Sequence, residues 1–201
     1  MIKHLYIKYK PFGFLCLIIA YLTLAGCSQS FPQTSTALAQ RPAQWATPLN
    51  KNMNLFEIAP GLYRSQQPTE EDTAQIEALG IKTIINLRGF HSDEDIIKNT
   101  DITLVRIPIH TWRIRDEHVI HALKAIEEAR KRGPVLIHCQ HGADRTGLVS
   151  AMYRIIYQGW SKEEAWAELE NGGYGYHSIW LNIPRYIRNV DSDAIKKALE
   201  Q

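Results

Sequence analysis

A cysteine and an arginine lie six positions apart in the chain, at Cys139 and Arg145. Gly142 lies between them, and glycine permits backbone conformations that other residues avoid. The segment follows the apolar stretch 135–137 and precedes a helical hydrophobic pattern, so we expect a loop between a buried strand and a helix. Backbone N–H groups of such a loop, together with the positive end of the helix, favour a bound anion. The sequence therefore predicts an anion site that contains a cysteine.

A thiol at this point is expected to be a thiolate at neutral pH, because the groups that favour a bound anion also stabilise the ionised sulfur. Arg145 presents a planar fork of donors that suits two oxygens of a phosphate group. Thr146 can offer its hydroxyl to the thiolate. The segment thus combines a nucleophile, an anion cradle and a bidentate clamp.

This Cys-x5-Arg pattern is similar to the signature of the cysteine-dependent protein tyrosine and dual-specificity phosphatases. The resemblance runs from about Leu55 to Asp191 and is nearest to exported bacterial members of the dual-specificity type. Its further motifs are Leu62-Tyr63-Arg64-Ser65, Pro134-Val135-Leu136-Ile137-His138, Tyr153-Arg154-Ile155-Ile156 and Gly159-Trp160-Ser161. The resemblance implies an α/β fold with a central, mostly parallel sheet flanked by helices.

The resemblance also implies a role for each residue of the loop. Cys139 would form a phosphocysteine, Arg145 would bind the phosphoryl oxygens, and Thr146 would assist release of the thiolate. His138 would orient the loop and stabilise the thiolate. The phosphate-binding backbone amides would be those of Gln140, His141, Gly142, Ala143, Asp144 and Arg145. No metal or other cofactor is expected, because the cradle and the arginine neutralise the phosphate charge.

The general acid is the point at which the sequence departs from the family. The position that aligns with the usual acidic residue holds Trp112. Asp116, four residues later, and Asp144, inside the loop, are the two candidates. Asp116 also fits a helix N-cap, and Asp144 also fits an acceptor that braces the loop. Asp116 is preferred by a small margin, because a loop ahead of its helix can bring a carboxylate over the pocket mouth.

The expected function is hydrolysis of phosphomonoesters, with phosphotyrosine, phosphoserine or phosphothreonine of a protein as substrate. One alternative is an inositol-phosphate or phosphoinositide phosphatase, in which His141, Arg113 and Arg115 would contact further phosphates. A second is a catalytically silent phosphate-binding module. A metal site at the cysteine and its neighbouring histidines, an inert core thiol and a rhodanese-like sulfurtransferase are disfavoured. Neighbours in one tight loop point apart, and no fourth metal ligand has suitable spacing.

Residues 1–26 are expected to be a lipoprotein signal peptide. Three lysines precede an apolar stretch of about a dozen residues, which is too short to span a bilayer stably. Leu24-Ala25-Gly26-Cys27 resembles the lipobox of bacterial lipoproteins, which implies cleavage before Cys27 and acylation of its thiol. Ser28 after the cysteine favours an anchor in the outer membrane, facing the periplasm. The alternative is a plain signal peptide with an incidental cysteine.

The length of 201 residues fits one domain plus such a segment. Residues 27–54 are polar without an apolar period and are expected to be a flexible tether, followed by the phosphatase domain over 55–201. If Cys16 leaves with the signal and Cys27 carries lipid, Cys139 is the one free thiol and no intramolecular disulfide forms. We expect a monomer.

The charge balance excludes nucleic acid as an expected partner. The formal net charge is +2, but without the three lysines of residues 1–10 the chain has 20 basic and 21 acidic residues. Such a chain has no general electrostatic attraction for DNA or RNA.

The hydrophobic pattern predicts an alternation of strands and helices from about Phe56. The expected strands are 61–65, 81–87, 102–109 and 134–138. The expected helices are 68–79, 92–98 (or a turn), 116–133, 148–156, 161–171 and 179–187. A capping box of Ser161 and Glu164 marks the start of one of them. Elements in this order favour an α/β domain with helices on both faces of the sheet.

Overall fold

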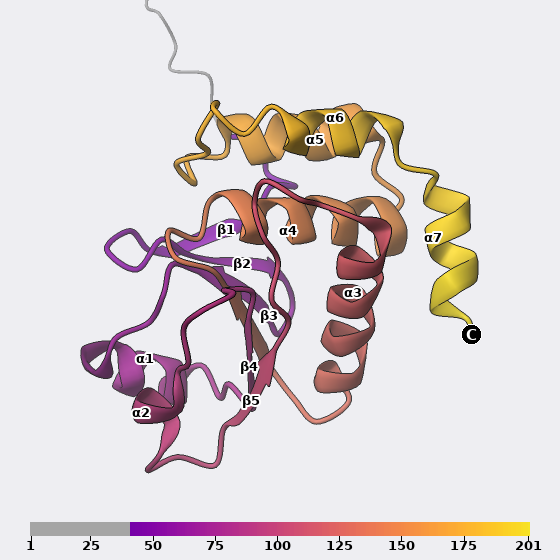
Figure 1. Ribbon diagram of the computed structural model, residues 1–201. Helices are drawn as coiled ribbons and strands as arrows, with labels where there is room; N and C mark the ends of the chain where they lie inside the picture. Colours follow the sequence, from indigo (N-terminus) through magenta and orange to yellow (C-terminus); the bar gives the residue numbers. More distant parts are fainter. Residues whose placement is uncertain (1–40) are drawn as a thin grey trace, which may run out of the picture. The chain divides into compact units, whose positions relative to one another are not determined.

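The structure is a computed structural model, and the residues described are 41–201 (Figure 1). The predicted signal peptide, the lipidation site Cys27 and residues 28–40 of the predicted tether lie outside the described residues. None of the helices among the described residues is long and apolar enough to cross a membrane.

A six-stranded sheet forms the centre of the domain, with strand order β1-β2-β3-β6-β4-β5. Its strands are β1 (Thr47–Asn50), β2 (Leu55–Ala59), β3 (Leu62–Ser65), β4 (Thr83–Asn86), β5 (Thr103–Arg106) and β6 (Val135–His138). The four strands β3, β6, β4 and β5 are parallel, whereas β1 and β2 extend the sheet as an antiparallel pair beside β3. The predicted mostly parallel sheet is confirmed, and the antiparallel extension is an addition.

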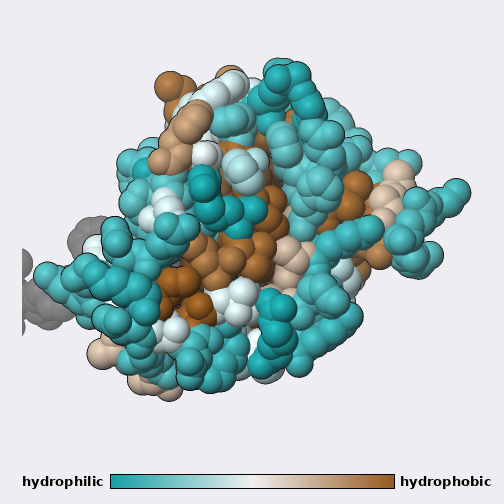
Figure 2. Space-filling view, turned by 60° about the horizontal axis from the view of Figure 1, so that its bottom comes forward, coloured by the Kyte–Doolittle hydropathy of each residue, from teal (hydrophilic) through white to brown (hydrophobic). Residues whose placement is uncertain are grey.

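Helices cover both faces of this sheet (Figure 1). On one face, α1 and α2 pack near a small apolar cluster around Leu55, Ile84 and Leu136. On the other face, α3 to α7 enclose the larger core, to which α4 contributes most of one side. The helices are α1 (Thr73–Ala78), α2 (Glu94–Ile97), α3 (Asp116–Arg130), α4 (Asp144–Tyr157), α5 (Lys162–Asn171), α6 (Asn182–Asn189) and α7 (Ser192–Leu199), with a 3-10 turn at Glu70–Asp72 before α1. A second view of the surface shows hydrophobic side chains in the centre of one face and hydrophilic ones around them (Figure 2).

Residues 41–54 belong to the folded domain, which corrects the predicted tether boundary. Arg41 Nη2 donates to the Tyr174 hydroxyl (2.8 Å), and the Ala46 amide donates to Glu168 Oε1 (2.6 Å). Both bonds join groups more than 120 residues apart in the chain. A polar composition describes only local hydrophobicity, so it could not reveal these distant contacts.

The C-terminal helices also differ from the prediction. The helix expected over 179–187 begins at Asn182, and Ile179 lies before it with 78% of its surface exposed. Only Ile183 and Ile187 of the expected apolar face are buried. The capping box before α5 is confirmed, because the Ser161 hydroxyl accepts from the Glu164 amide (3.1 Å) and the Glu164 carboxylate accepts from the Ser161 amide (2.8 Å). Helix α7 was not predicted.

A buried ion pair ties α4 to α5. Arg154 Nε and Nη2 donate to the two carboxylate oxygens of Glu168 at 2.8 and 2.9 Å. Burial alone raises the pKa of Glu168, but the charge and hydrogen bonds of Arg154, with those of the Ala46 amide and the Tyr174 hydroxyl, outweigh it and hold that pKa below its usual range. The carboxylate is therefore ionised at neutral pH although it is buried.

The parallel register places four loops at one edge of the sheet. Ser65 and Asn86, the last residues of β3 and β4, are both paired with His138, the last residue of β6. The chain therefore leaves β3, β4, β5 and β6 at the same edge. The loop after β6 lies directly against the end of β3, since a Cβ atom on Gly142 would be 2.6 Å from the carbonyl carbon and oxygen of Ser65.

We expect Gly142→Ala to destabilise the domain more than Gly159→Ala. Both glycines have a left-handed φ, +69° and +71°, which costs an alanine about 1–2 kcal/mol. Only the Cβ at position 142 meets backbone, whereas nothing lies within 4 Å of one at position 159. The clash should add about 1–3 kcal/mol. Denaturant unfolding of the two variants measures the difference, and equal free energies of unfolding would show that the loop yields without cost.

Candidate active site

Cys139 lies at the start of the loop between β6 and α4, and it is 2% exposed. It is the one free cysteine among residues 41–201. The loop ends at Ala143, and α4 begins at Asp144. The predicted placement of the thiol between a buried strand and a helix N-terminus is therefore the one the structure shows.

Three consecutive carbonyl groups of the loop point away from its interior, and each accepts a hydrogen bond from another segment. The bonds are Gln67 N to Gln140 O (3.1 Å), Asn54 Nδ2 to His141 O (2.8 Å) and Arg64 Nη2 to Gly142 O (2.6 Å). The peptide bonds of the described residues are all trans. In a planar trans peptide the N–H points opposite to the C=O. The amides of residues 141–143 therefore face the interior of the loop, where they can converge on an anion.

Two further donors lie in the first turn of α4. Arg145 is half-buried, and Thr146 is fully buried. Arg145 Nε and Thr146 Oγ1 are both shielded from solvent and have no hydrogen-bond partner among the described residues. Buried polar atoms are rarely left unpaired. These two atoms thus fit an anionic ligand better than they fit a purely structural role.

His138, immediately before the cysteine, is bound by a residue that sequence reasoning missed. Its Nε2 lies 2.9 Å from Asp93 Oδ2, and both side chains are fully buried. Burial alone raises the pKa of Asp93, but the hydrogen bond and charge of His138, with the amides of Gln67 and Asn86, hold that pKa below its usual range. Asp93 lies in the loop after β4, and no local sequence pattern marks it.

Arg64 contacts the outward-facing backbone of the loop and is 1% exposed. Its guanidinium lies 3.5 Å from the centre of the Tyr174 ring, a cation–π distance. Burial lowers the pKa of Arg64, while Tyr174, Glu168 and Cys139 oppose that effect. The motif at 62–65 drew attention to this arginine without giving it a role. The structure shows that it holds the Gly142 carbonyl.

Asp144 lies in the wall of the loop. Its two carboxylate oxygens accept from the backbone amide (3.0 Å) and the ring Nδ1 (2.9 Å) of His177. It is 7% exposed. Asp144 therefore braces the segment before α6 against the loop.

Asp116 lies at the start of α3 and is exposed. Its alternative interpretation as an N-cap is wrong, because Arg115 holds the N-cap position and no side chain caps the helix there. The Tyr186 hydroxyl donates to Asp116 Oδ1 at 2.8 Å. A cleft of about 620 Å³ opens beside it, lined also by Trp112 and Arg113.

An exposed group of rings lies on the loops after β4 and β5. Trp112 stacks on His110 at 4.8 Å, and Phe90 lies 5.7 Å from His110. Phe90 is 90% exposed and Trp112 is 65% exposed. Since both loops leave the sheet at the edge where Cys139 lies, these rings are expected to form part of the rim of the site.

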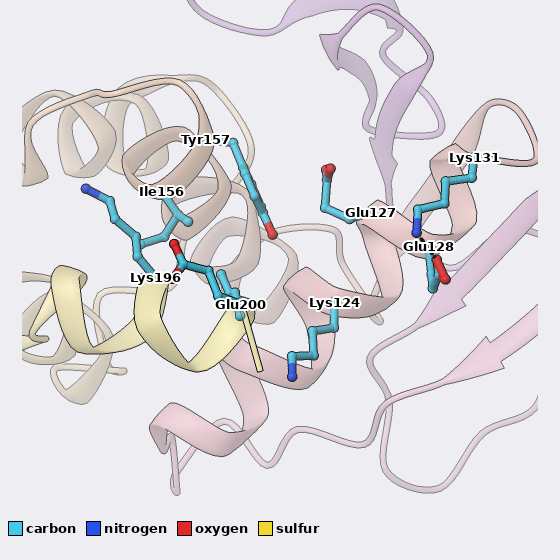
Figure 3. A pocket seen from close by; sticks show the side chains of 9 residues that line it. Lys124, Glu127, Glu128, Lys131, Ile156, Tyr157, Lys196 and Glu200 are labelled. Carbon is cyan, nitrogen blue, oxygen red and sulfur yellow. Dashed lines mark ion pairs between the residues drawn. The ribbon is translucent and has the colours of Figure 1, made fainter.

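Another cleft, of about 520 Å³, lies between α3, α4 and α7 (Figure 3). Its lining includes Ile156 and Tyr157 at the C-terminal end of α4, whereas Cys139 lies at the N-terminal end of that helix. Charges of both signs surround it, including the ion pair of Lys131 with Glu128 (2.6 Å). None of the residues that line this cleft belongs to the loop that contains Cys139 and Arg145. No group of three or more histidine, cysteine or acidic side chains in residues 41–201 is arranged to hold a metal ion.

Residues 62–176 match the family model described as "Dual specificity phosphatase, catalytic domain". The chain is 33% identical over 192 residues to the dual specificity protein phosphatase TpbA of Pseudomonas aeruginosa, covering 94% of this chain and 87% of that protein. It is 28% identical to the inositol diphosphatase DSP2 of Oryza sativa subsp. japonica, covering 59% of this chain and 61% of that protein.

Solved structures agree with these matches. The crystal structure of P. aeruginosa TpbA superimposes with a TM-score of 0.76 at 34% identity, covering 80% of this chain and 99% of that one. A second TpbA structure, a cysteine-to-serine variant in complex with pTyr, gives a TM-score of 0.75 at 33% identity, with the same coverage. The loop geometry and these matches lead to one conclusion: the chain belongs to the dual specificity phosphatases, the cysteine-dependent enzymes that hydrolyse phosphate monoesters.

Proposed function

We propose that this phosphatase removes phosphate from phosphorylated protein side chains, phosphotyrosine in particular, through a phosphocysteine on Cys139. The observation that carries the proposal is the loop itself. One segment contains inward-facing amides, a buried thiol and two buried donors that have no partner within the described part of the chain. The pTyr complex of the similar protein TpbA supports the same substrate class.

In the proposed mechanism, the Cys139 thiolate attacks phosphorus while the bond to the leaving oxygen breaks. Arg145 and the loop amides bind the non-bridging oxygens and stabilise the charge that is spread over them in the transition state. A general acid gives its proton to the leaving oxygen. Water then attacks the phosphocysteine, the acid's conjugate base takes the water proton, and inorganic phosphate leaves as the thiolate is restored. The Thr146 hydroxyl would stabilise that departing sulfur.

We propose Asp116 as the general acid rather than Asp144. Both oxygens of Asp144 already accept bonds from His177, so this carboxylate is held in the loop wall. Asp116 is exposed beside the cleft that Trp112 also lines, and within residues 41–201 only one of its oxygens has a partner. A carboxylate that is free on one side can meet the leaving group of a bound substrate.

Protein substrates are favoured over inositol phosphates by the surroundings of the loop. Of the two arginines that could bind further phosphates, Arg115 is engaged with Glu117 at 2.6 Å. The exposed rings of Phe90 and Trp112 suit an aromatic or apolar peptide side chain better than a highly charged ring. We also propose that the enzyme acts as a monomer, because one chain supplies the loop, its supports and its arginine.

The central test compares the wild type, Cys139→Ser and Arg145→Lys on phosphotyrosine peptides, phosphoserine peptides and inositol phosphates. We expect the wild type to prefer phosphotyrosine, because its ring can pack against the aromatic rim. Cys139→Ser should lose turnover and keep phosphate binding, because the amides and arginine remain. Arg145→Lys should lose at least about 100-fold in kcat/KM, because an ammonium lacks the bidentate fork. Near-wild-type turnover by Cys139→Ser would contradict the covalent mechanism, and a preference for inositol phosphates would overturn the proposed substrate.

The acid is identified by leaving-group dependence. We expect Asp116→Asn to slow alkyl phosphates strongly and activated aryl phosphates little, because basic leaving groups need the proton most. Asp144→Asn should change kcat by a similar factor for all substrates. The kcat values against graded leaving groups, with melting temperatures as a control, decide between them. A flat dependence in Asp116→Asn together with a steep one in Asp144→Asn would reverse the assignment.

We propose further that Cys27 carries a lipid that anchors the enzyme at the outer membrane, facing the periplasm. The proposal is supported by the basic start, the apolar segment and the Leu24–Cys27 box of the sequence. More than one acyl chain would make the anchor stable, whereas one alone is marginal.

Membrane sedimentation and detergent partitioning test the anchor. The wild type should be found with membranes, and Cys27→Ala should be released or left unprocessed because no thiol remains to be acylated. Cys16→Ala is the control, since it changes a cysteine within the predicted signal. An unmodified mature chain beginning beyond residue 27, seen by mass spectrometry, would rule out the lipid.

A further inference from the structure

Both ring nitrogens of His138 face oxygen atoms that accept hydrogen bonds. Nδ1 lies 3.2 Å from the carbonyl oxygen of Cys139, and Nε2 lies 2.9 Å from Asp93 Oδ2. A backbone carbonyl has no proton to give, so the contact at Nδ1 is a hydrogen bond only if Nδ1 carries a proton. This contact therefore places a proton on Nδ1.

The second nitrogen is assigned by the surroundings of Asp93. Asn86 Nδ2 donates to Asp93 Oδ2 at 2.7 Å, and Gln67 Nε2 donates to Oδ1. These amide donors favour the ionised carboxylate, in agreement with the lowered pKa of Asp93. An ionised carboxylate only accepts, so Nε2 must also carry a proton.

We propose that His138 is an imidazolium held by Asp93, and that Asp93 is a positioning residue for the nucleophile. The positive end of this buried ion pair adjoins Cys139, and its negative end is turned toward Gln67 and Asn86. The inference rests on the proposed role of Cys139. It assigns to Asp93 the task of keeping a fixed positive charge beside the thiolate.

The other charged groups near the pair do not remove this asymmetry. His91 Nε2 is 3.9 Å from Asp93 Oδ1 and is half exposed, so it faces the negative end. Arg64 contacts the loop and Arg145 follows it, so both add positive charge at the end of the pair that adjoins Cys139. Because the pKa of Asp93 is depressed, its carboxylate stays ionised through the ordinary carboxyl range and takes up a proton only as the pH falls below that range.

The protonation of His138 can be measured in the wild-type chain by NMR of 15N-labelled histidine. We expect protons on both ring nitrogens at pH 7, with the signal assigned by its loss in His138→Gln. A neutral ring with one protonated nitrogen at pH 7 would overturn the proposal. This measurement requires neither turnover nor a stable variant at Asp93.

The effect on the thiol is measured by alkylation with iodoacetamide, followed by mass spectrometry of the peptide that contains Cys139. In Asp93→Asn the imidazolium loses its counter-charge, so the pH at half-maximal alkylation rate should rise by about one unit. Asp93→Glu should restore part of the shift, and Asp95→Asn, an exposed carboxylate on α2, should leave it unchanged.

A double variant separates positioning from general damage. If Asp93 acts through His138, adding Asp93→Asn to His138→Gln should change the alkylation profile no further. Additive shifts, or an unchanged profile in folded Asp93→Asn, would refute the assignment. Failure of the proposed function would be distinct, because it would leave alkylation normal while phosphotyrosine turnover was absent.

Discussion

The inward orientation of the loop amides depends on donors outside the loop. A peptide group cannot turn its N–H toward a ligand unless its C=O, on the opposite side, is also satisfied. Here Asn54, Arg64 and Gln67 satisfy three consecutive carbonyls. Asn54 directly precedes β2, Arg64 lies in β3, and Gln67 follows β3. The site therefore requires that β3 lie beside β6. The close contact at Gly142 follows from the same adjacency.

Several charged side chains of the domain are buried, and each is in contact with a partner. Arg64 contacts a carbonyl and the Tyr174 ring, Asp93 contacts His138, and Arg154 contacts Glu168. Unpaired, each of these charges would be costly to bury. Burial also raises the pKa of Tyr174 to about 12, and its hydroxyl donates to Glu168. Buried polar contacts therefore support the active-site loop together with the apolar core.

The nucleophile and the phosphate-binding loop were predictable from the sequence because they lie within one short segment. Cys139 and Arg145 share a loop whose flanking strand and helix have clear hydrophobic patterns, and the order of elements gave the parallel part of the sheet. The supporting residues were not predictable in the same way. Asn54 and Asp93 are polar residues in loops, and their partners are 87 and 45 positions away.

Hydrophobic periodicity also predicted the wrong start for the helix that contains Ile183 and Ile187. Ile179 continues the spacing of Ile183 and Ile187, yet it lies before α6 and is exposed. Spacing shows which residues could share a helical face, but not where the chain turns. The same limit explains the segment 41–54, whose contacts are made by backbone and polar groups rather than by an apolar face.

Those contacts have a mechanical consequence. Arg41, the first described residue, bonds to the Tyr174 hydroxyl, the Tyr174 ring lies against Arg64, and Arg64 holds the Gly142 carbonyl. Arg41 and the catalytic loop are thus linked through the side chains of Tyr174 and Arg64. A displacement of Arg41 would therefore act on the catalytic loop as well as on the backbone that enters β1.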